Sequence, residues 1–557
     1  MTLGGLYQEQ KRWAEAEAEF QAAIAAQPKE SAPRASLARL YFAQGQIPQA
    51  EKVLLDAKAQ LPDDPAAYRM LGDTYLARGE MAKAMDEFTA LTKAHPNDVS
   101  LHRTYAQLLI LNNRLKEASE VIEAILKKTP QDPEALVQKG QIELREKKVD
   151  DAITTLQSAL KNAPESGAAH YYLGLAYGEK GNALQAEGEW RQAVRLSPRM
   201  PEAWMALCGS ASQRSDWRSL ADLSAQWQKS SPEAVDAYLF HAAALLRQGD
   251  TAGAEADLTH LAQVAPQNPT VYAKLGDLRL SQKRVSDAES LYHQALSRDP
   301  NSLEAIYGLV RIALQKNKPG EAQEIVQQQI ARTPDKPGVY LLQAKLDLQL
   351  KNPDGVQAAL KHMLSLNAKD VNALLFLAQI QSSTNQLDQA VANYQKAIEA
   401  QPNDVRPYEA LGRLYELQGN WQEAQNAYQK AIALQPENPL VSNNLAFLML
   451  ERGGNVNVAL TLAQTARKGL PNLPNTADTL GWAYYHDQAY ALAAPLLQEA
   501  VKKVPDNQMY RYHLGLTYQK LKNPQAAKTE FEKAITLDPK STLADEARRA
   551  LSETTGT

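Results

Sequence analysis

The stretch "PYEALGRLYELQGNWQEAQNAYQKAIALQP" (407–436) contains a complete helix–turn–helix pattern. Its large residues Tyr408, Leu411 and Tyr415 are spaced three and four residues apart, which is typical of one face of an amphipathic helix. Tyr428 and Ala431 continue the same spacing in a second segment. A glycine at 419 suits the left-handed residue that ends a helix, and a proline at 436 stops the second helix. The stretch predicts two helices joined by a tight turn.

This pattern recurs every 34 residues along nearly the whole chain. Each repeat is numbered here from 1 to 34 with Ser31 at position 1, which puts proline at position 32. Position 8 is Gly or Ala in fourteen of sixteen units, and position 20 is Ala in fourteen. Small residues at these two positions let the two helices of a unit approach closely. The prolines are Pro28, Pro62, Pro96, Pro130, Pro164, Pro198, Pro232, Pro266, Pro300, Pro334, Pro402, Pro436, Pro471, Pro505 and Pro539, with Ala368 in the remaining place.

These residues resemble the tetratricopeptide repeat. The resemblance implies an all-α fold, a right-handed superhelical solenoid of antiparallel helix pairs, whose concave groove holds partner proteins or peptides. We expect an incomplete first repeat at residues 1–30, fifteen consecutive repeats over 31–541 with one inserted residue near 453–458, and a C-terminal capping helix and tail over 542–557. Because the first helix lacks its opening turn, we expect that upstream repeats or a targeting segment have been lost. A frayed native first helix is the alternative.

Composition excludes several classes of protein. The net charge of −4 and the lack of a long Lys/Arg run argue against nucleic-acid binding. The single cysteine, Cys208, cannot form an internal disulfide. Apolar runs fall short of the roughly 18 residues that span a bilayer, so no transmembrane segment is predicted in this chain. The N-terminus has neither the charged start nor the apolar centre of a signal peptide.

No catalytic motif accompanies the repeats. The sequence contains no HExxH, paired CxxC, phosphate loop or GxSxG, and its nine histidines are scattered. We therefore predict no catalytic residues, no metal site, no cofactor and no enzyme activity. Cys208 stands at position 8, where Gly or Ala occurs elsewhere, so a packing role is predicted for it rather than a nucleophilic one. Its repeat, 201–234, is the least regular, and also carries Leu220, Ser224 and Trp227 where other residues are expected, together with Trp217.

In the family that the chain resembles, positions 2, 5, 9 and 12 face the groove. Near the N-terminus these positions hold Arg39, Arg69 and Arg103, which could bind a carboxylate-bearing partner. An ordinary solvated face is the alternative for these arginines. Midway along the chain the same positions hold Tyr171, Tyr307 and Leu175. No repeat combines Lys at position 5 with Asn at position 9, the pair with which one variety of these repeats grips peptide C-termini.

Near the C-terminus the groove positions gather aromatic residues beside two polar ones. Such a collection is typical of a binding surface. Packing between repeats is the alternative, because aromatic residues at helical spacing usually belong to the core. The candidate binding residues are Asn443, Phe447, Asp478, Trp482, Tyr485 and Tyr512.

Residues 441–535 are similar to bacterial envelope TPR lipoproteins associated with PEP-CTERM protein sorting and exopolysaccharide systems. The leading hypothesis is a non-catalytic scaffold that binds partner proteins or peptides in its groove, in such an envelope assembly. A self-assembling fibre or lattice protein, and a polysaccharide-binding accessory of polymer export, are the alternatives. The expected location is the periplasm or outer membrane if a signal has been lost, and otherwise the cytoplasm.

Overall fold

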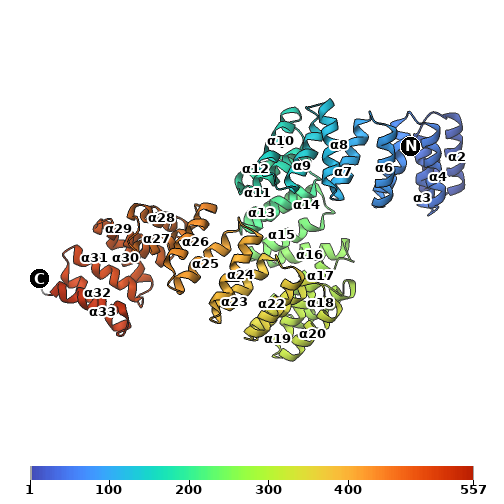
Figure 1. Cartoon of the computed structure of the whole chain (residues 1–557). Coiled ribbons are helices and arrows are strands. Elements are labelled where there is room, and N and C mark those ends of the chain that lie inside the picture. Colours follow the sequence, from blue (N-terminus) through green and yellow to red (C-terminus); the bar gives the residue numbers. More distant parts are fainter. Residues whose placement is uncertain (1–2, 556–557) are drawn as a thin grey trace. The chain divides into compact units, whose positions relative to one another are not determined.

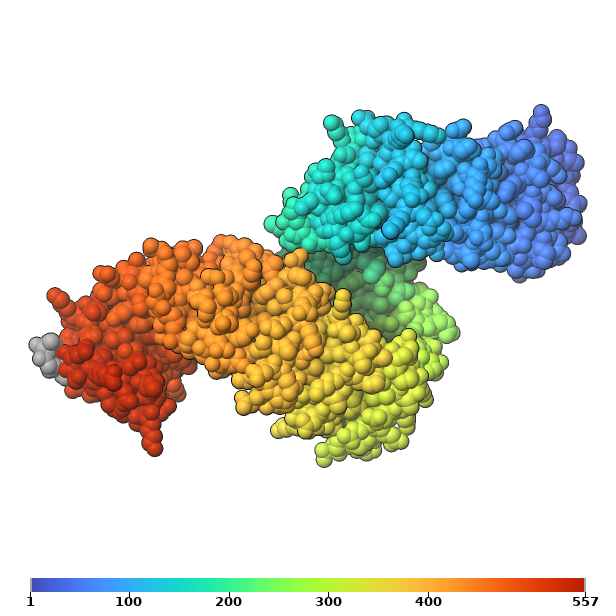
Figure 2. Space-filling view, in the orientation of Figure 1, coloured from blue at the N-terminus to red at the C-terminus, as the bar shows by residue number. Residues whose placement is uncertain are grey.

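The computed structural model describes residues 3–555, in which helices alternate with short turns and no strand occurs (Figure 1). The chain divides between Gln267 and Asn268 into two compact units, called unit 1 and unit 2. Within each unit consecutive helices pack against one another. Figure 2 shows the same order at the surface, where each part of a unit borders on its neighbours in sequence. The predicted all-α fold of helix pairs is confirmed.

The helix bounds follow the 34-residue period. Unit 1 contains α1 (Leu3–Glu9), α2 (Trp13–Ala26), α3 (Ala32–Ala43), α4 (Ile47–Gln60), α5 (Pro65–Ala77), α6 (Met81–Ala94), α7 (Val99–Leu111), α8 (Leu115–Lys128), α9 (Pro133–Arg145), α10 (Val149–Asn162), α11 (Gly167–Glu179), α12 (Ala183–Leu196), α13 (Pro201–Gln213), α14 (Trp217–Ser230), α15 (Val235–Gln248) and α16 (Thr251–Val264).

Unit 2 continues the alternation. It contains α17 (Pro269–Ser281), α18 (Val285–Arg298), α19 (Leu303–Gln315), α20 (Pro319–Arg332), α21 (Pro337–Gln349), α22 (Pro353–Leu366), α23 (Val371–Ser383), α24 (Leu387–Ala400), α25 (Val405–Leu417), α26 (Trp421–Leu434), α27 (Pro439–Glu451), α28 (Val456–Gly469), α29 (Pro474–His486), α30 (Tyr490–Lys503), α31 (Gln508–Lys520), α32 (Pro524–Leu537) and α33 (Thr542–Thr555). The end of the tail expected after the capping helix, residues 556–557, lies outside the described residues.

In many repeats the residue at position 34 caps the N-terminus of the first helix of the following repeat. Asp132 Oδ1 accepts a hydrogen bond from Ala135 N at 3.0 Å, and Asn438 Oδ1 accepts one from Val441 N at 3.1 Å. These bonds satisfy N–H groups that have no partner within the helix. Proline often follows in the first turn, where its missing N–H costs nothing. Position 34 therefore marks the start of the first helix in the repeats that carry such a cap.

The turn between the two helices has a left-handed residue at position 15 in all sixteen units. The six glycines there confirm the prediction, with φ of +70° to +85°. The ten other units adopt the same conformation with a different residue, which the sequence did not reveal. These residues are Lys11, Asn113, Lys147, Ser215, Lys283, Asn317, Lys351, Asn385, Gln488 and Lys522.

Position 8 is small because the side chain at position 24 of the same unit lies against it. A Cβ on Gly72 would lie 2.8 Å from Cε2 of Phe88, and one on Gly515 would lie 2.6 Å from Cε1 of Phe531. Both distances are below contact range, so the aromatic ring occupies the place of the missing side chain. The pairing of positions 8 and 24 thus sets how closely the two helices of a unit pack.

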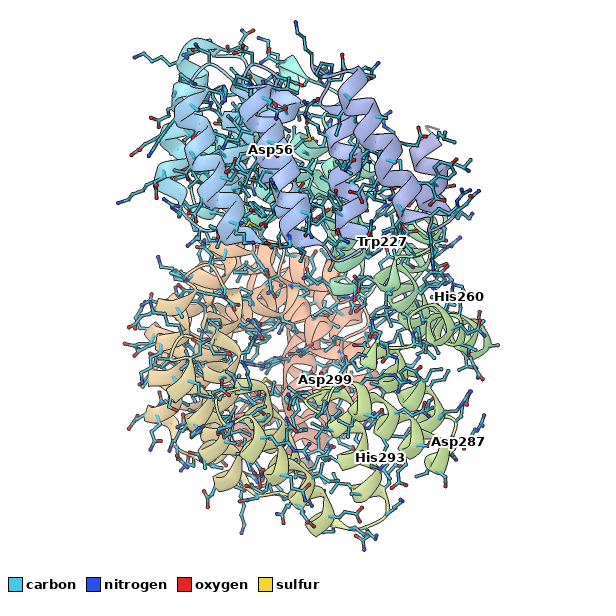
Figure 3. All side chains as sticks on the ribbon, turned by 90° about the vertical axis from the view of Figure 1, so that its right-hand side faces the viewer. Asp56, Trp227, His260, Asp287, His293 and Asp299 are labelled. Carbon is cyan, nitrogen blue, oxygen red and sulfur yellow. The ribbon has the colours of Figure 1, made fainter. Side chains whose placement is uncertain are left out.

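The irregular repeat 201–234 fills its core in a different way. Cys208 and Ser224 stand at positions 8 and 24, and both are fully buried. Trp227, labelled in Figure 3, is 1% exposed and stacks on Trp204 with ring centroids 6.4 Å apart. The unusual residues of this repeat are therefore core residues of unit 1.

Candidate functional site

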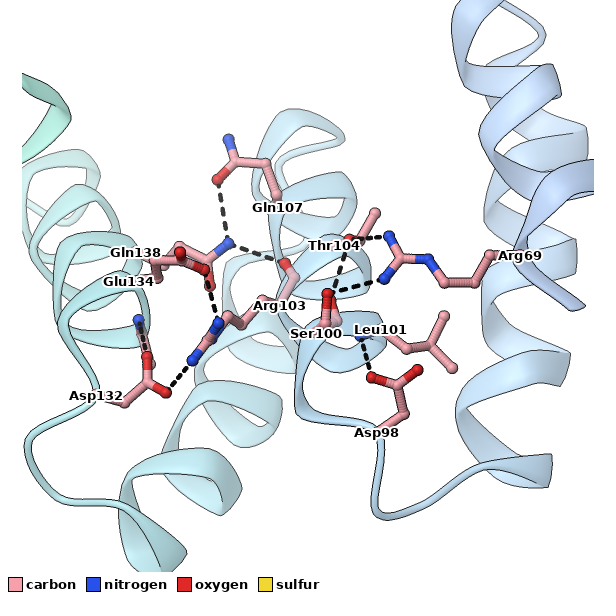
Figure 4. Close-up of polar contacts among 11 residues, drawn as sticks. Arg69, Asp98, Ser100, Leu101, Arg103, Thr104, Gln107, Asp132, Glu134 and Gln138 are labelled. Atoms are coloured by element: carbon pink, nitrogen blue, oxygen red, sulfur yellow. Dashed lines mark hydrogen bonds and ion pairs between the residues drawn. The ribbon is translucent and has the colours of Figure 1, made fainter. Parts of the chain in front are cut away.

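Two of the three candidate arginines are bonded to the next repeat (Figure 4). Arg69 donates to Ser100 Oγ at 2.9 Å and to Thr104 Oγ1 at 3.0 Å. Arg103 forms ion pairs with Asp132 and, at 2.8 Å, with Glu134. The carboxylates that Arg103 holds thus belong to its own chain.

Arg39 is exposed and makes only a short-range contact, from Nη2 to Ser36 Oγ at 3.2 Å. The three arginines therefore differ in their surroundings, although they occupy equivalent positions. Their role in binding a partner carboxylate stays a prediction.

The C-terminal candidates Asn443, Phe447 and Asp478 line a pocket of about 410 Å³ in unit 2, called here the Asn443 pocket. The pocket extends along the first helices α25, α27 and α29 and the start of α31. Its walls include residues of positions 2, 5, 9 and 12, the stripe named from the sequence. Arg413, Glu416, Asn444, Asn475, Thr479, Asn507, Met509 and Tyr510 complete the lining.

Two amide side chains of the Asn443 pocket have unsatisfied oxygens. Asn443 is 5% exposed, and its Oδ1 is buried with no hydrogen-bond partner among the described residues. The Oδ1 of Asn475 is in the same state. A buried acceptor without a partner costs about 1–3 kcal/mol, so a ligand that brought a donor to these atoms would relieve that cost.

The acidic residues of the pocket already have partners. Asp478 is 2% exposed, and its Oδ1 lies 3.0 Å from His513 Nδ1. Glu416 Oε2 accepts a hydrogen bond from the Tyr428 hydroxyl at 2.6 Å, and burial raises the pKa of the Glu416 carboxyl above its ordinary value. Unlike these carboxylates, the amide oxygens of Asn443 and Asn475 thus remain available to a ligand.

Trp482 lies outside the lining of the Asn443 pocket, in the packing between repeats. It is 7% exposed, and its Nε1 donates to Glu451 Oε1 at 2.8 Å. Its ring stacks on His513 at 4.0 Å and on Tyr485 at 4.6 Å between centroids. These contacts join α27, α29 and α31, which favours the packing interpretation of Trp482.

Tyr485 and Tyr512 also lie outside the lining of the pocket, and both are half-buried. Burial raises the pKa of each hydroxyl, to about 12 for Tyr512. The six C-terminal candidates therefore fall into two groups, three that line the pocket and three beside it. Their binding role stays a prediction.

Unit 1 contains a larger pocket, of about 570 Å³, along α9, α11 and α13. It is called here the Tyr171 pocket. Tyr171 and Leu175, named from the sequence, line it together with Tyr172. Gln141 is buried in its wall at 7% exposed. Asn475 and Gln141 occupy stripe positions 2 and 9, but only the unpartnered Oδ1 of Asn475 and the burial of Gln141 set them apart from other polar residues.

Three further features of residues 3–555 bear on metal binding, thiol reactivity and membrane crossing. Within residues 3–555 no three His, Cys, Asp or Glu side chains are grouped so as to hold a metal ion. Burial raises the pKa of the Cys208 thiol to about 12, which keeps it protonated and favours its packing role. None of the described helices is long and apolar enough to cross a membrane.

The fold and its sites define a repeat protein of stacked helix pairs. Family profiles described as tetratricopeptide repeat match residues 7–73, 75–139, 137–201, 279–346, 405–438 and 510–541, and one described as TPR repeat matches 378–419. Together these ranges extend over more than half of the chain. The chain belongs to the tetratricopeptide repeat family.

Among solved structures, the chain is similar to the following two. The APC/C hetero-tetramer Cut9–Hcn1 matches with a TM-score of 0.43 and 16% identity, over 88% of this chain and 96% of that chain. YrrB, described as a TPR protein with an unusual peptide-binding site, matches with a TM-score of 0.30 and 23% identity, over 35% of this chain and 99% of that chain. The search of curated proteins returned no significant match.

Proposed function

We propose that the chain is a non-catalytic scaffold that binds partner polypeptides, and that the Asn443 pocket holds an extended segment of one partner. The observation that carries this proposal is the buried, unpartnered Oδ1 of Asn443 in the pocket wall. A primary amide both donates and accepts hydrogen bonds, as a peptide group does. Asn443 and Asn475 would therefore bind main-chain groups of the partner, and Phe447 and Met509 would contact its side chains.

Side chains beside the bound main chain would decide which partner segments the Asn443 pocket accepts. Main-chain recognition gives affinity for an extended segment without fixing its sequence, so specificity would come from the side chains beside it. Arg413 lies at the pocket and pairs only loosely with Glu409, at 3.9 Å. An acidic residue in the partner segment would complement that arginine.

Selection from a displayed decapeptide library on the full chain tests the proposal. Enriched peptides would be synthesised and their Kd measured by calorimetry for the parent and for Asn443→Ala and Asn475→Ala. We expect each substitution to weaken binding about tenfold, the effect of one lost hydrogen bond of about 1.4 kcal/mol. Asn472→Ala, an exposed residue outside the pocket, is the control.

Unchanged affinity in both pocket variants would sink the proposed site, and so would a library that yields no peptide. The narrower setting, a bacterial envelope assembly, rests only on the resemblance of residues 441–535. Fractionation of source cells tests that setting, since a scaffold of an envelope assembly would be recovered with the membranes. Sedimentation of the purified chain tests the fibre alternative, which requires mass that grows with concentration.

A further inference from the structure

The Tyr171 pocket has an apolar centre on the first helices of three consecutive repeats. Leu144 of α9, Tyr171, Tyr172 and Leu175 of α11, and Met200 before α13 line it. The rings of Tyr171 and Tyr172 meet edge to face, with centroids 5.1 Å apart. Such a surface matches an apolar side chain of a ligand.

A polar side chain that its own chain leaves unbonded lines this centre. Gln141 is 7% exposed and lines the pocket, and no other described residue forms a hydrogen bond with its side-chain amide. The hydroxyls of Tyr171 and Tyr172 are likewise unbonded within the described chain. Burial raises the pKa of both, to about 12 for Tyr172, so they remain neutral donors. The pocket thus offers polar groups that its own chain does not use.

The charges of the pocket are separated between its two ends. Lys147 and Glu179 neutralise each other in an ion pair of 3.2 Å. Arg145 remains at the C-terminal end of α9, where Nη1 donates to the carbonyl of Ile110 at 2.8 Å and its other N–H groups stay available. Glu202, in the first turn of α13, is exposed and forms no ion pair within residues 3–555. One end is therefore basic and the other acidic.

We propose that the Tyr171 pocket is a second docking site, which takes a partner polypeptide segment with one apolar side chain between a basic and an acidic residue. The basic residue of the partner segment lies beside Glu202, and its acidic residue lies beside Arg145. A main-chain group of the segment bonds to the Gln141 amide. Charge complementarity of this kind fixes the register and excludes segments of the wrong sign. The chain then carries one docking site in each compact unit, with different chemistry, and links two segments.

Fluorescence anisotropy of labelled, end-blocked nonapeptides on the full chain tests this site. Each peptide carries one Arg, one Glu and one Leu or Tyr, at varied spacing. The variants are Glu202→Lys, whose side chain is exposed and unpaired in the described structure, and Gln141→Leu. Glu120→Lys, another exposed glutamate of unit 1 on α8, is the control of equal charge change.

We expect the best nonapeptide to bind the Glu202→Lys and Gln141→Leu variants at least tenfold more weakly than the parent and the Glu120→Lys control. A peptide with Glu in place of its Arg should regain affinity for Glu202→Lys. Equal effects of Glu202→Lys and Glu120→Lys, or the lack of any saturable binding, would overturn the site. Because Asn443→Ala leaves this pocket untouched, loss of one site is measured separately from loss of the other.

Discussion

The ring of Tyr292 occupies the space that a side chain at Gly276 would need. A Cβ on Gly276 would lie 2.6 Å from Cε1 of Tyr292, and the same ring also lies against Gly308 of the following repeat. Tyr292 is fully buried, and its hydroxyl donates to Asp277 Oδ1 at 2.8 Å. One tyrosine thus sets the spacing of α17, α18 and α19.

Replacing Gly276 with Ala should loosen this packing. Overpacking costs about 1–3 kcal/mol, whereas the better helix propensity of Ala returns about 1 kcal/mol. We expect faster amide hydrogen exchange in α17–α19, measured by mass spectrometry, because repeat proteins open locally. Gly188→Ala on α12, where a Cβ would meet nothing within 4 Å, should leave exchange unchanged or slow it.

Arg103→Ala should destabilise the junction of its repeat with the next. The substitution leaves Asp132, which is 4% exposed and caps α9, without its cation. Losing a hydrogen bond to a charged group lowers the free energy of unfolding by about 1.5–3 kcal/mol. Arg39→Ala should change stability by less than about 0.5 kcal/mol, because Arg39 is exposed. Equal urea midpoints for the two variants would contradict the structural role of Arg103.

Trp482→Ala should loosen the last repeats, because the ring is buried and stacked on both Tyr485 and His513. Removal of such a side chain costs about 3–5 kcal/mol. The expected result is faster hydrogen exchange in α27, α29 and α31. A variant that exchanges like the parent would instead make Trp482 dispensable for packing, and would revive its predicted role in binding.

Cys208 should not react with a thiol reagent in the folded chain. The side chain is fully buried, and burial raises the pKa of the thiol to about 12, so almost no thiolate exists near pH 8. Labelling with a chromogenic disulfide should appear only in denaturant, together with the unfolding of α13 and α14. Rapid labelling under native conditions would show that this repeat opens readily.

The last repeats should lose stability as the pH falls below about 6.5. Burial lowers the pKa of His486 from its ordinary value of 6.5, so the unfolded chain binds this proton more readily than the folded chain. The contribution of His486 to the free energy of unfolding is therefore fully present above pH 6.5 and declines as the pH falls below that value. Urea midpoints between about pH 5 and 7 should depend less on pH in His486→Phe than in the parent or in His293→Phe, whose histidine is exposed.

The repeat itself was readable because its signals are local and recur. Gly419 and Pro436 indicated the ends of two helices, and α25 and α26 end close to these residues. The 34-residue period also predicted helix ends in repeats that depart from the pattern. For example, α22 ends at Leu366 although Ala368 replaces the proline. Lys147 and Ser215 adopt the left-handed turn without glycine, because the closure of each helix pair imposes that conformation on whatever residue is there.

The sequence by itself determined the all-α repeat fold, the stripe of positions 2, 5, 9 and 12, and the packing role of Cys208. Only the tertiary structure decided which residues of that stripe remain without a partner. Arg103 pairs with Asp132, the cap of the following first helix α9, and Trp482 donates to Glu451 of the preceding repeat, whereas the buried Oδ1 of Asn443 is left without a partner. The reason is physical: helices form from contacts within a unit, but the pairing of a buried polar group depends on side chains about one repeat away.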